Sequence, residues 1–196
     1  QSHGKTNRYS TDSRGRRMTK INYGCGPNLK DDYVNVDKYV EGDGIASWSL
    51  EDAPFEEGTV TEILAEHVVE HLSFAEEESF FRASYALLCP GGVLAIEVPD
   101  FEWVAAKFIE AEDDFKGFYQ IGSADHYFGN GTSCDYRWSL LTTAIWGNQN
   151  GAGQFHKNGY TIRKLEKIKT LVGFRSIECE LGFNKGTQVI KARFKK

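Results

Sequence analysis

The chain has 196 residues, which is enough for one compact domain with a full core and too short for two ordinary domains joined by a linker. Hydrophobic residues make up 40% and charged residues 26%, with 20 Gly and 4 Pro, and this balance excludes collagen, a disordered tail protein and a coiled coil. The 23 Lys and Arg against 28 Asp and Glu give a formal net charge of -5. We therefore expect an acidic globular domain without a nucleic-acid partner.

The first seventeen residues differ from the rest of the chain. The chain opens with Gln1-Ser2-His3, and its only methionine, Met18, stands directly before the first strand-like run. We interpret residues 1–17 as an expression tag or disordered arm and residues 18–196 as a single domain. Without the basic segment, 18 basic and 27 acidic residues remain, and the net charge falls to -9.

Cysteine usage and hydropathy indicate the compartment. The four cysteines are scattered and form no C-x-x-C pair, which is typical of thiols in a reducing environment. No apolar run approaches the roughly 20 residues that span a bilayer, and the start lacks the apolar core of a signal peptide. These features predict a cytoplasmic protein without a membrane partner.

Strand-like and helix-like stretches alternate from Lys20 onward, which is typical of an α/β domain with a mainly parallel sheet. The predicted strands are 20–24, 33–37, 44–50, 59–66, 92–98, 174–181 and 187–194. The last two flank Asn184-Lys185-Gly186, which predicts an antiparallel hairpin at one side of the sheet.

Helical periodicity predicts two helices. Residues 74–88 place Phe74, Phe81, Tyr85 and Leu88 on one face, and the run Cys89-Pro90-Gly91-Gly92 is expected to end that helix. Residues 161–172 repeat Ile162, Leu165, Ile168 and Val172 before Gly173. The basic residues of this second stretch, from Arg163 to Lys169, are expected to form its solvated face.

A glycine turn follows the first strand. Gly24-Cys25-Gly26 lets a ligand approach the backbone closely at the carboxyl end of a strand. The next strand ends at Asp37, whose carboxylate could accept hydrogen bonds from ribose hydroxyls. The third glycine of the dinucleotide fingerprint is missing, and Pro27 after Gly26 has no amide to donate to a phosphate. The turn therefore suits a nucleotide-like cofactor without a pyrophosphate.

Four motifs in order continue this pattern: the glycine turn, residues 48–55 (WSLEDAPF), residues 63–72 (ILAEHVVEHL) and residues 87–100 (LLCPGGVLAIEVPD). Together they cover about residues 20–100. In this region the sequence resembles the class I S-adenosylmethionine-dependent methyltransferases. A weaker resemblance through residues 155–160 (FHKNGY) and Gly173-Phe174 is similar to a branch of small methyltransferases linked to surface polysaccharides.

The resemblance implies a Rossmann-like seven-stranded methyltransferase sheet, mainly parallel with an antiparallel C-terminal hairpin, and S-adenosyl-L-methionine as cofactor. It sets Gly24, Cys25 and Gly26 against the methionine part of the cofactor and Asp37 on its ribose. The other implied cofactor-binding residues are Tyr23 before the turn, Ser49 and Leu50 beside the adenine, and Glu66 and His67 in the pocket wall.

The chain departs from the family at two places. Ser49 stands where the family has an acidic residue for the adenine amino group. Only residues 25–32 connect the first two strands, fewer than the dozen or so residues that a helical crossover needs. We therefore expect the first helix to be a stub or missing.

Residues 67–71 (HVVEH) match H-x-x-E-H, the inverted zinc-protease signature. A catalytic zinc would need His67 and His71 on one helix face and a third protein ligand, and the sequence offers no evident acidic helix for the third. The competing interpretation is that Glu70 and His71 form and cap a helix start. We favour this second interpretation and assign no metal-binding residue.

The segment 101–160 is long for a connection between strands and holds 13 of the 26 aromatic residues. Long connections at the carboxyl edge of an α/β sheet build substrate sites, so we expect this insertion to face the substrate. Its aromatic residues could wall a sugar or pack a subsidiary core, namely Phe101, Trp103, Tyr119, Tyr127, Phe128, Trp138 and Trp146. Residues 129–131 and 147–153 are candidates for loops that close over substrate.

An acceptor hydroxyl must lose a proton during methyl transfer. His156, His126 and Asp100 are the candidate bases, with His156 preferred. The competing interpretations are exposed loop positions for the two histidines and a helix cap for Asp100.

These features predict a methyltransferase, an enzyme of the transferase class, that methylates a small-molecule or carbohydrate acceptor. Two alternatives are a non-catalytic cofactor-binding or partner module and a zinc hydrolase that uses residues 67–71.

Overall fold

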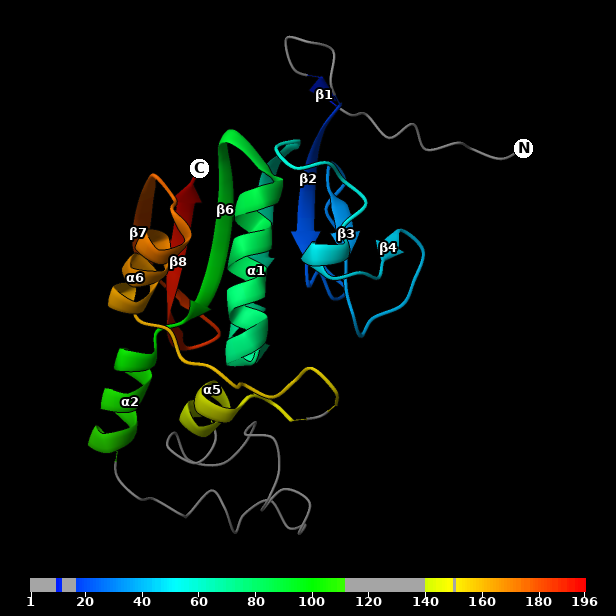
Figure 1. Cartoon of the computed structure of the whole chain (residues 1–196). Helices are drawn as coiled ribbons and strands as arrows, with labels where there is room; N and C mark the ends of the chain where they lie inside the picture. Colours follow the sequence, from blue (N-terminus) through cyan, green and yellow to red (C-terminus); the bar gives the residue numbers. More distant parts are fainter. Residues whose placement is uncertain (1–9, 12–16, 112–139, 150) are drawn as a thin grey trace.

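In the computed structural model of the chain, the structure describes residues 10–11, 17–111, 140–149 and 151–196. The strands, helices and short 3-10 helices follow one another in an α/β order (Figure 1). The strands are β1 (Ser10–Thr11), β2 (Arg17–Tyr23), β3 (Val34–Val36), β4 (Ile45–Ala46), β5 (Val60–Glu66), β6 (Leu88–Pro99), β7 (Ser176–Asn184) and β8 (Thr187–Lys195).

The sheet runs in the order β4-β3-β2-β5-β6-β8-β7, with β1 paired to β2 outside this path. Strands β4, β3, β2, β5 and β6 are parallel, whereas β8 is antiparallel to both β6 and β7. The tight turn at Lys185 and Gly186, both with positive φ, joins β7 to β8. The predicted seven-stranded sheet and its antiparallel C-terminal hairpin are confirmed.

The helices are α1 (Phe74–Leu87), α2 (Phe101–Glu110), α5 (Thr142–Trp146) and α6 (Ile162–Val172), with 3-10 turns η1 (Leu50–Asp52) and η2 (Val69–His71). Among these described helices, α1 and α6 lie on one face of the sheet, whereas α2 and α5 lie beyond its lower end in the view of Figure 1. Helix α6 ends at Gly173 in the left-handed region, as predicted. No helix among the described residues has the length and apolar character to span a membrane.

Three local predictions were wrong. Helix α1 is capped by Ser73, whose side chain accepts from the Glu76 amide while the Glu76 carboxylate accepts from the Ser73 amide, so Glu70 and His71 belong to η2 and not to the start of α1. The helix predicted over 74–88 is confirmed to within one residue, but the strand predicted over 92–98 already begins at Leu88, so residues 89–92 lie within β6. The predicted strand 44–50 shrinks to β4, since Leu50 begins η1.

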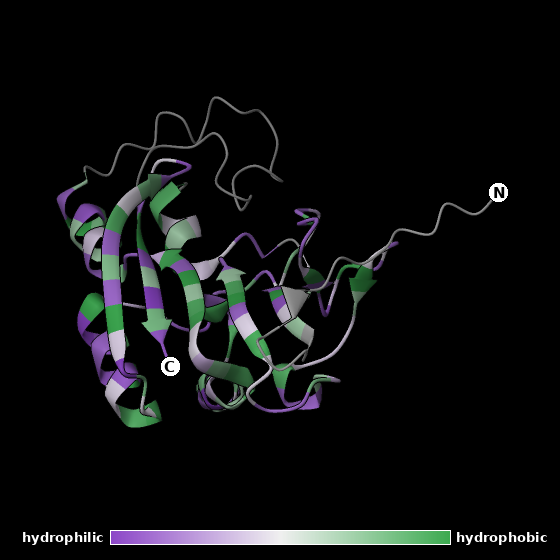
Figure 2. Cartoon of the chain, turned by 90° about the horizontal axis from the view of Figure 1, so that it is seen from above, coloured by the Kyte–Doolittle hydropathy of each residue, from purple (hydrophilic) through white to green (hydrophobic). Residues whose placement is uncertain are grey.

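The buried face of α1 also differs from the prediction. Phe81 is buried as expected, but Phe74 is 76% exposed and Phe80 takes a core position. The aromatic rings of Phe80, Phe81 and Phe194 form a continuous contact from α1 to β8. In the hydropathy view, apolar segments alternate with polar ones along the strands (Figure 2). The core consists of buried side chains from the sheet together with those of α1 and α6.

The sheet buries one side of its central strands more completely than the other. The register aligns Ile21, Ile63, Leu94 and Phe194 in one cross-strand row, and all four side chains are fully buried. The adjacent row, which faces the opposite side, aligns Lys20, Glu62, Val93 and Lys195, and none of these four is buried. Since side chains alternate along a strand, the first row faces α1 and α6 and the second row faces away from them.

Candidate functional site

The predicted site residues follow strands that end at the same edge of the sheet. Gly24 follows β2, Asp37 follows β3, His67 follows β5 and Asp100 follows β6, and these strands are parallel. Their carboxyl ends therefore meet at one edge, where α/β folds build ligand sites.

The two glycines of the glycine turn differ in what surrounds them. Gly24 has φ +66°, and a Cβ there would lie 2.4 Å from Val68 Cγ2, so packing against the loop after β5 requires this glycine. Gly26 has φ +50°, and a Cβ there would meet no atom within 4 Å. Of these two glycines, only Gly26 borders open space, and a ligand that approaches the turn would do so there.

Asp37 holds the glycine turn to the end of β3. Its Oδ2 accepts from the Gly26 amide at 2.8 Å, and its Oδ1 accepts from the amides of Tyr39 and Val40 at 2.8 and 2.9 Å. A carboxylate offers about four lone-pair sites, so these three bonds leave about one for a ligand hydroxyl. The structure thus brings Gly26 and Asp37 together, as their positions in the sequence suggested.

Tyr23 and Cys25 turn toward the protein on either side of Gly24. The Tyr23 ring lies 5.7 Å from the Phe80 ring, and burial, followed by the charge of Glu51, raises the pKa of its hydroxyl to about 12. Cys25 is buried, and its amide donates to the Val36 carbonyl. Burial raises the pKa of the Cys25 thiol, so both side chains stay neutral near pH 7.

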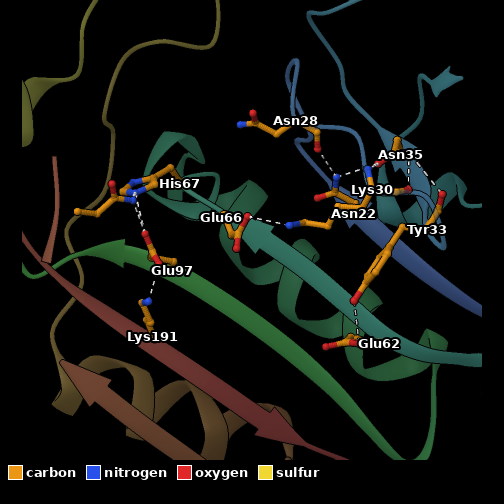
Figure 3. Close-up of polar contacts among 11 residues, drawn as sticks. Asn22, Asn28, Lys30, Tyr33, Asn35, Glu62, Glu66, His67, Glu97 and Lys191 are labelled. Atoms are coloured by element: carbon orange, nitrogen blue, oxygen red, sulfur yellow. Dashed lines mark hydrogen bonds and ion pairs between the residues drawn. The ribbon is translucent and has the colours of Figure 1, made fainter. Parts of the chain in front are cut away.

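The short crossover between β2 and β3 contains no helix, as expected, and two asparagines hold it in place. Asn22 Nδ2 donates to Asn35 Oδ1 at 2.8 Å and to the Asn28 carbonyl at 2.9 Å. Asn35 Oδ1 also accepts from the Lys30 amide, and its Nδ2 donates to the Lys30 carbonyl (Figure 3). This pair, Asn22 and Asn35, forms an asparagine clamp that was not among the predicted residues, although one polar residue in each of two neighbouring strands beside a short connection was a usable signal.

The predicted adenine side contains a carboxylate that sequence analysis did not single out. Leu50 is buried in η1, whereas the Ser49 hydroxyl donates to Asp52 Oδ2 at 2.7 Å. A carboxylate therefore lies three residues after Ser49, in contact with its hydroxyl.

Glu66 and His67 end β5 and face different partners. Glu66 pairs with Lys30 of the short crossover at 3.6 Å (Figure 3). His67 has φ +53° and lies between two carboxylates, with Nδ1 3.1 Å from Glu70 Oε1 and Nε2 3.2 Å from Glu97 Oε1. The hydrogen bond with Glu70 is the main cause that raises the pKa of His67, and it outweighs the effect of burial, so the imidazole favours its charged form.

The segment 155–160 lies against η2. The amides of Lys157 and Asn158 both donate to the Glu70 carbonyl, and the buried Tyr160 hydroxyl donates to the Val69 carbonyl at 3.2 Å. His156 Nδ1 lies 2.9 Å from the Ala144 carbonyl, and its ring packs edge-on against the His71 ring at 4.7 Å. Burial lowers the pKa of His156, which keeps this imidazole neutral at pH 7.

Asp100 caps α2. Its Oδ1 accepts from the amides of Glu102 and Trp103, and its Oδ2 accepts from Gln188 Nε2 at 2.8 Å. The capping interpretation is therefore confirmed, and both oxygens are engaged. His126, the third candidate base, lies outside the described residues.

The predicted aromatic wall is described only in part. Phe101 and Trp146 are exposed, and Trp103 packs edge-on against Phe183 of β7 at 5.7 Å. The other four aromatic residues and the loop 129–131 lie outside the described residues. Gly147, the first residue of the loop 147–153, forms an isolated antiparallel bridge with Phe155. Gly153, its last residue, packs so closely against the Tyr39 ring that a Cβ there would clash with the ring. This loop therefore reaches across the sheet edge to the strand end that carries Asp37.

Comparisons with known proteins support the fold. Neither a protein-family model nor a curated protein matches the sequence. A SAM-dependent methyltransferase from Archaeoglobus fulgidus is similar in structure, with a TM-score of 0.55 and 14% identity over 91% of this chain and 86% of that one. A 1,6-didemethyltoxoflavin-N1-methyltransferase from Burkholderia thailandensis has a TM-score of 0.55 and 12% identity over 91% of this chain and 70% of that one.

A third structure, a possible histamine N-methyltransferase from Thermotoga maritima, has a TM-score of 0.54 and 11% identity over 91% of this chain and 82% of that one. At such low identity the likeness concerns the backbone arrangement alone. The sheet order and these similar structures together show that the chain has the class I fold of the S-adenosylmethionine-dependent methyltransferases.

Proposed function

We propose that the chain is an S-adenosylmethionine-dependent methyltransferase that methylates a small-molecule or carbohydrate acceptor. The observation that supports this most is the turn at the sheet edge, where the Gly26 amide and the Asp37 carboxylate are joined at 2.8 Å and open space lies beside Gly26. A nucleoside with a short amino-acid tail fits such a turn, because it needs close backbone approach and one carboxylate for its ribose.

The proposed cofactor contacts follow from this placement. Gly24, Cys25 and Gly26 would border the methionine part, and Asp37 would accept from one ribose hydroxyl with its remaining lone-pair site. Ser49 and Leu50 would border the adenine, with Asp52 as the nearby carboxylate that could accept from its amino group. Glu66 and His67 would form the wall at the end of β5.

When bound, S-adenosylmethionine supplies an electrophilic methyl group for an in-line displacement. The contribution of the chain is mainly to hold the acceptor atom in line with the methyl carbon, at about 3–3.5 Å. A hydroxyl acceptor must also lose its proton. When no metal ion is bound, we assign this proton to His156 Nε2, because its Nδ1 lies at a carbonyl. Asp100 is less suited, because its Oδ1 caps α2 and its Oδ2 accepts from Gln188.

The acceptor is proposed to bind beside the segment 101–160. This segment connects β6 to α6 along the chain, and it carries the aromatic residues that could stack on a sugar ring. The resemblance of residues 155–160 to the polysaccharide-linked branch favours a carbohydrate hydroxyl. Replacement of His156 by Ala should then lower turnover strongly while cofactor affinity stays unchanged.

Calorimetric titration of metal-free protein with S-adenosylmethionine and its demethylated product tests the proposal. We expect one site per chain and at least about tenfold weaker binding in Asp37→Asn, because a charge-assisted hydrogen bond contributes roughly 1.5–3 kcal/mol. Asp43→Asn is the matched control, since Asp43 is exposed in the loop after β3.

Absence of binding, or equal affinities for Asp37→Asn and the wild type, would contradict the cofactor assignment. If the cofactor binds but no acceptor is methylated in a screen of small molecules and saccharides, the result would favour the non-catalytic cofactor-binding module.

A further inference from the structure

Three potential metal ligands lie together where η2 meets the segment 155–160. Glu70, His71 and His156 each offer one ligand atom, and these three atoms all lie within 4.8 Å of one another. Ligand atoms around a tetrahedral zinc lie roughly 3.3 Å apart, as bond lengths of about 2.0–2.2 Å require. Modest side-chain rotations would therefore bring the three atoms into one coordination shell.

Both imidazoles are oriented by backbone carbonyls. His71 Nδ1 lies 3.1 Å from the Phe155 carbonyl, and His156 Nδ1 lies 2.9 Å from the Ala144 carbonyl. A carbonyl can only accept, so each Nδ1 carries the proton and each Nε2 keeps its lone pair. This is the arrangement in which metal-binding histidines are held, with one nitrogen donating to a carbonyl and the other free to bind.

Glu70 contributes a carboxylate oxygen that lacks a protein partner. Its side chain is almost completely buried, with 1% of the residue exposed. Oε1 lies 3.1 Å from His67 Nδ1, whereas the buried Oε2 has no hydrogen-bond partner. A buried carboxylate oxygen without a partner costs free energy, and a cation beside it would remove that cost.

The backbone around the three side chains is fixed. The Glu70 carbonyl accepts from the amides of Lys157 and Asn158, and the Tyr160 hydroxyl donates to the Val69 carbonyl. These bonds join η2 to a segment that lies far away in the sequence, so Glu70 and His71 stay close to His156 without a ligand. A prearranged set of this kind reduces the cost of ordering the ligands on binding.

From this geometry we propose a binding site for a divalent transition metal, with zinc as the best match, formed by Glu70, His71 and His156. Two imidazole nitrogens and one carboxylate oxygen are a ligand set of catalytic zinc sites, which leave the fourth position for water or a substrate oxygen. The site differs from the H-x-x-E-H interpretation of the sequence, because His67 is held between Glu70 and Glu97 and His156 takes its place.

A metal ion here would change the chemistry at the sheet edge. It would use the His156 lone pair that base catalysis needs, and it could instead lower the pKa of an acceptor hydroxyl at its open position. This catalytic role rests on the proposed function, whereas metal binding itself does not.

The test is zinc titration of the full chain after treatment with a chelator, followed by calorimetry and by the absorption of Co²⁺ as a spectroscopic substitute. We expect one zinc per chain, a visible Co²⁺ spectrum of tetrahedral intensity, and a zinc-dependent rise in Tm. Mg²⁺ should not compete at equal concentration, because it prefers an all-oxygen shell.

Variants identify the ligands. His71→Ala and His156→Gln should each weaken zinc binding by more than about 100-fold. Loss of a residue that only orients a metal ligand costs at most about 100-fold in metal affinity, so a larger effect indicates a direct ligand. His67→Gln is the matched control. It should still bind one zinc per chain, with a smaller loss of affinity than the two ligand variants. Circular dichroism of each metal-free variant establishes that it is folded, and Glu70→Gln replaces any histidine variant that is not.

Four results would overturn the proposal. They are a wild type without stoichiometric zinc, zinc binding that survives both His71→Ala and His156→Gln, equal binding of Mg²⁺, and loss of zinc in His67→Gln but not in His156→Gln. None of these results depends on cofactor binding or on methyl transfer, so failure of the metal site and failure of the proposed function can be distinguished.

Discussion

The two faces of the sheet are stabilised by different interactions. On the face toward α1 and α6, Ile21, Ile63, Leu94 and Phe194 form a fully buried apolar row. On the other face, polar side chains pair with one another, including Glu62 of β5 with Tyr33, Lys20 and Arg193. Figure 3 shows such contacts, with Lys191 paired to Glu97 and Lys30 to Glu66.

The difference follows from the lengths of the two kinds of crossover. Between β5 and β6 the chain is long enough for α1, which covers the sheet with Phe80 and Phe81. Between β2 and β3 it is too short for a helix, so hydrogen bonds from Asn22 and Asn35 hold the connection. The glycine turn thus lies on a connection held by polar contacts.

Removing apolar volume from the helix-covered face should have the largest effect. Phe81→Ala should lower the free energy of unfolding by about 3–5 kcal/mol, because the fully buried ring contacts Phe80 and Phe194. Phe74→Ala on the same helix, at a 76% exposed position, should change it by less than about 0.5 kcal/mol. Urea unfolding measures both, and similar losses in the two variants would show that α1 does not bury the face described.

Breaking the asparagine clamp should have an intermediate effect. Asn35→Ala removes the Oδ1 acceptor of one Asn22 Nδ2 hydrogen and of the Lys30 amide, so we expect the free energy of unfolding to fall by about 1–3 kcal/mol, together with weaker cofactor binding. Asn28→Ala is the control, because Asn28 joins the clamp through its carbonyl, which the substitution keeps. Equal stability of Asn35→Ala and Asn28→Ala would mean that the clamp does not hold the crossover.

The smallest effect is expected from the polar face. Glu62→Gln should cost about 0–1 kcal/mol, decreasing with added salt, since exposed ion pairs contribute little. Its clearer signal is the Tyr33 phenol, whose pKa is raised to about 12 by burial and by the hydrogen bond to Glu62. In Glu62→Gln this pKa should fall toward its ordinary value of 10.0.

The stability that Tyr33 contributes has a defined pH window. Because its folded-state pKa is raised, the contribution is complete below pH 10 and disappears as the pH rises through about 12. Ultraviolet titration, with Tyr33→Phe to identify the signal, measures the shift. An unchanged Tyr33 titration in Glu62→Gln would remove the hydrogen bond as a cause.

Short-range sequence patterns located much of the fold. The alternation of strand-like runs, the turn at Lys185 and Gly186, and the end of α6 at Gly173 were all evident in the sequence and are confirmed. The predicted start of α1 at Phe74 is confirmed, but its cap was misassigned to Glu70 and His71, although Ser73 and Glu76 have the spacing of a capping box. The polar face was also signalled by the alternation of Lys191, Arg193 and Lys195, but alternation does not say which face a helix covers.

The sequence by itself determined the order of the strands along the chain and the pairing of a glycine turn with an acidic strand end, because both depend on residues close together or on the common direction of parallel strands. Only the tertiary structure decided that Glu70 and His71 lie beside His156 and that His67 faces Glu97. Those contacts join segments distant in sequence, and their partners are set by how α1, β6 and the segment 155–160 pack at the sheet edge.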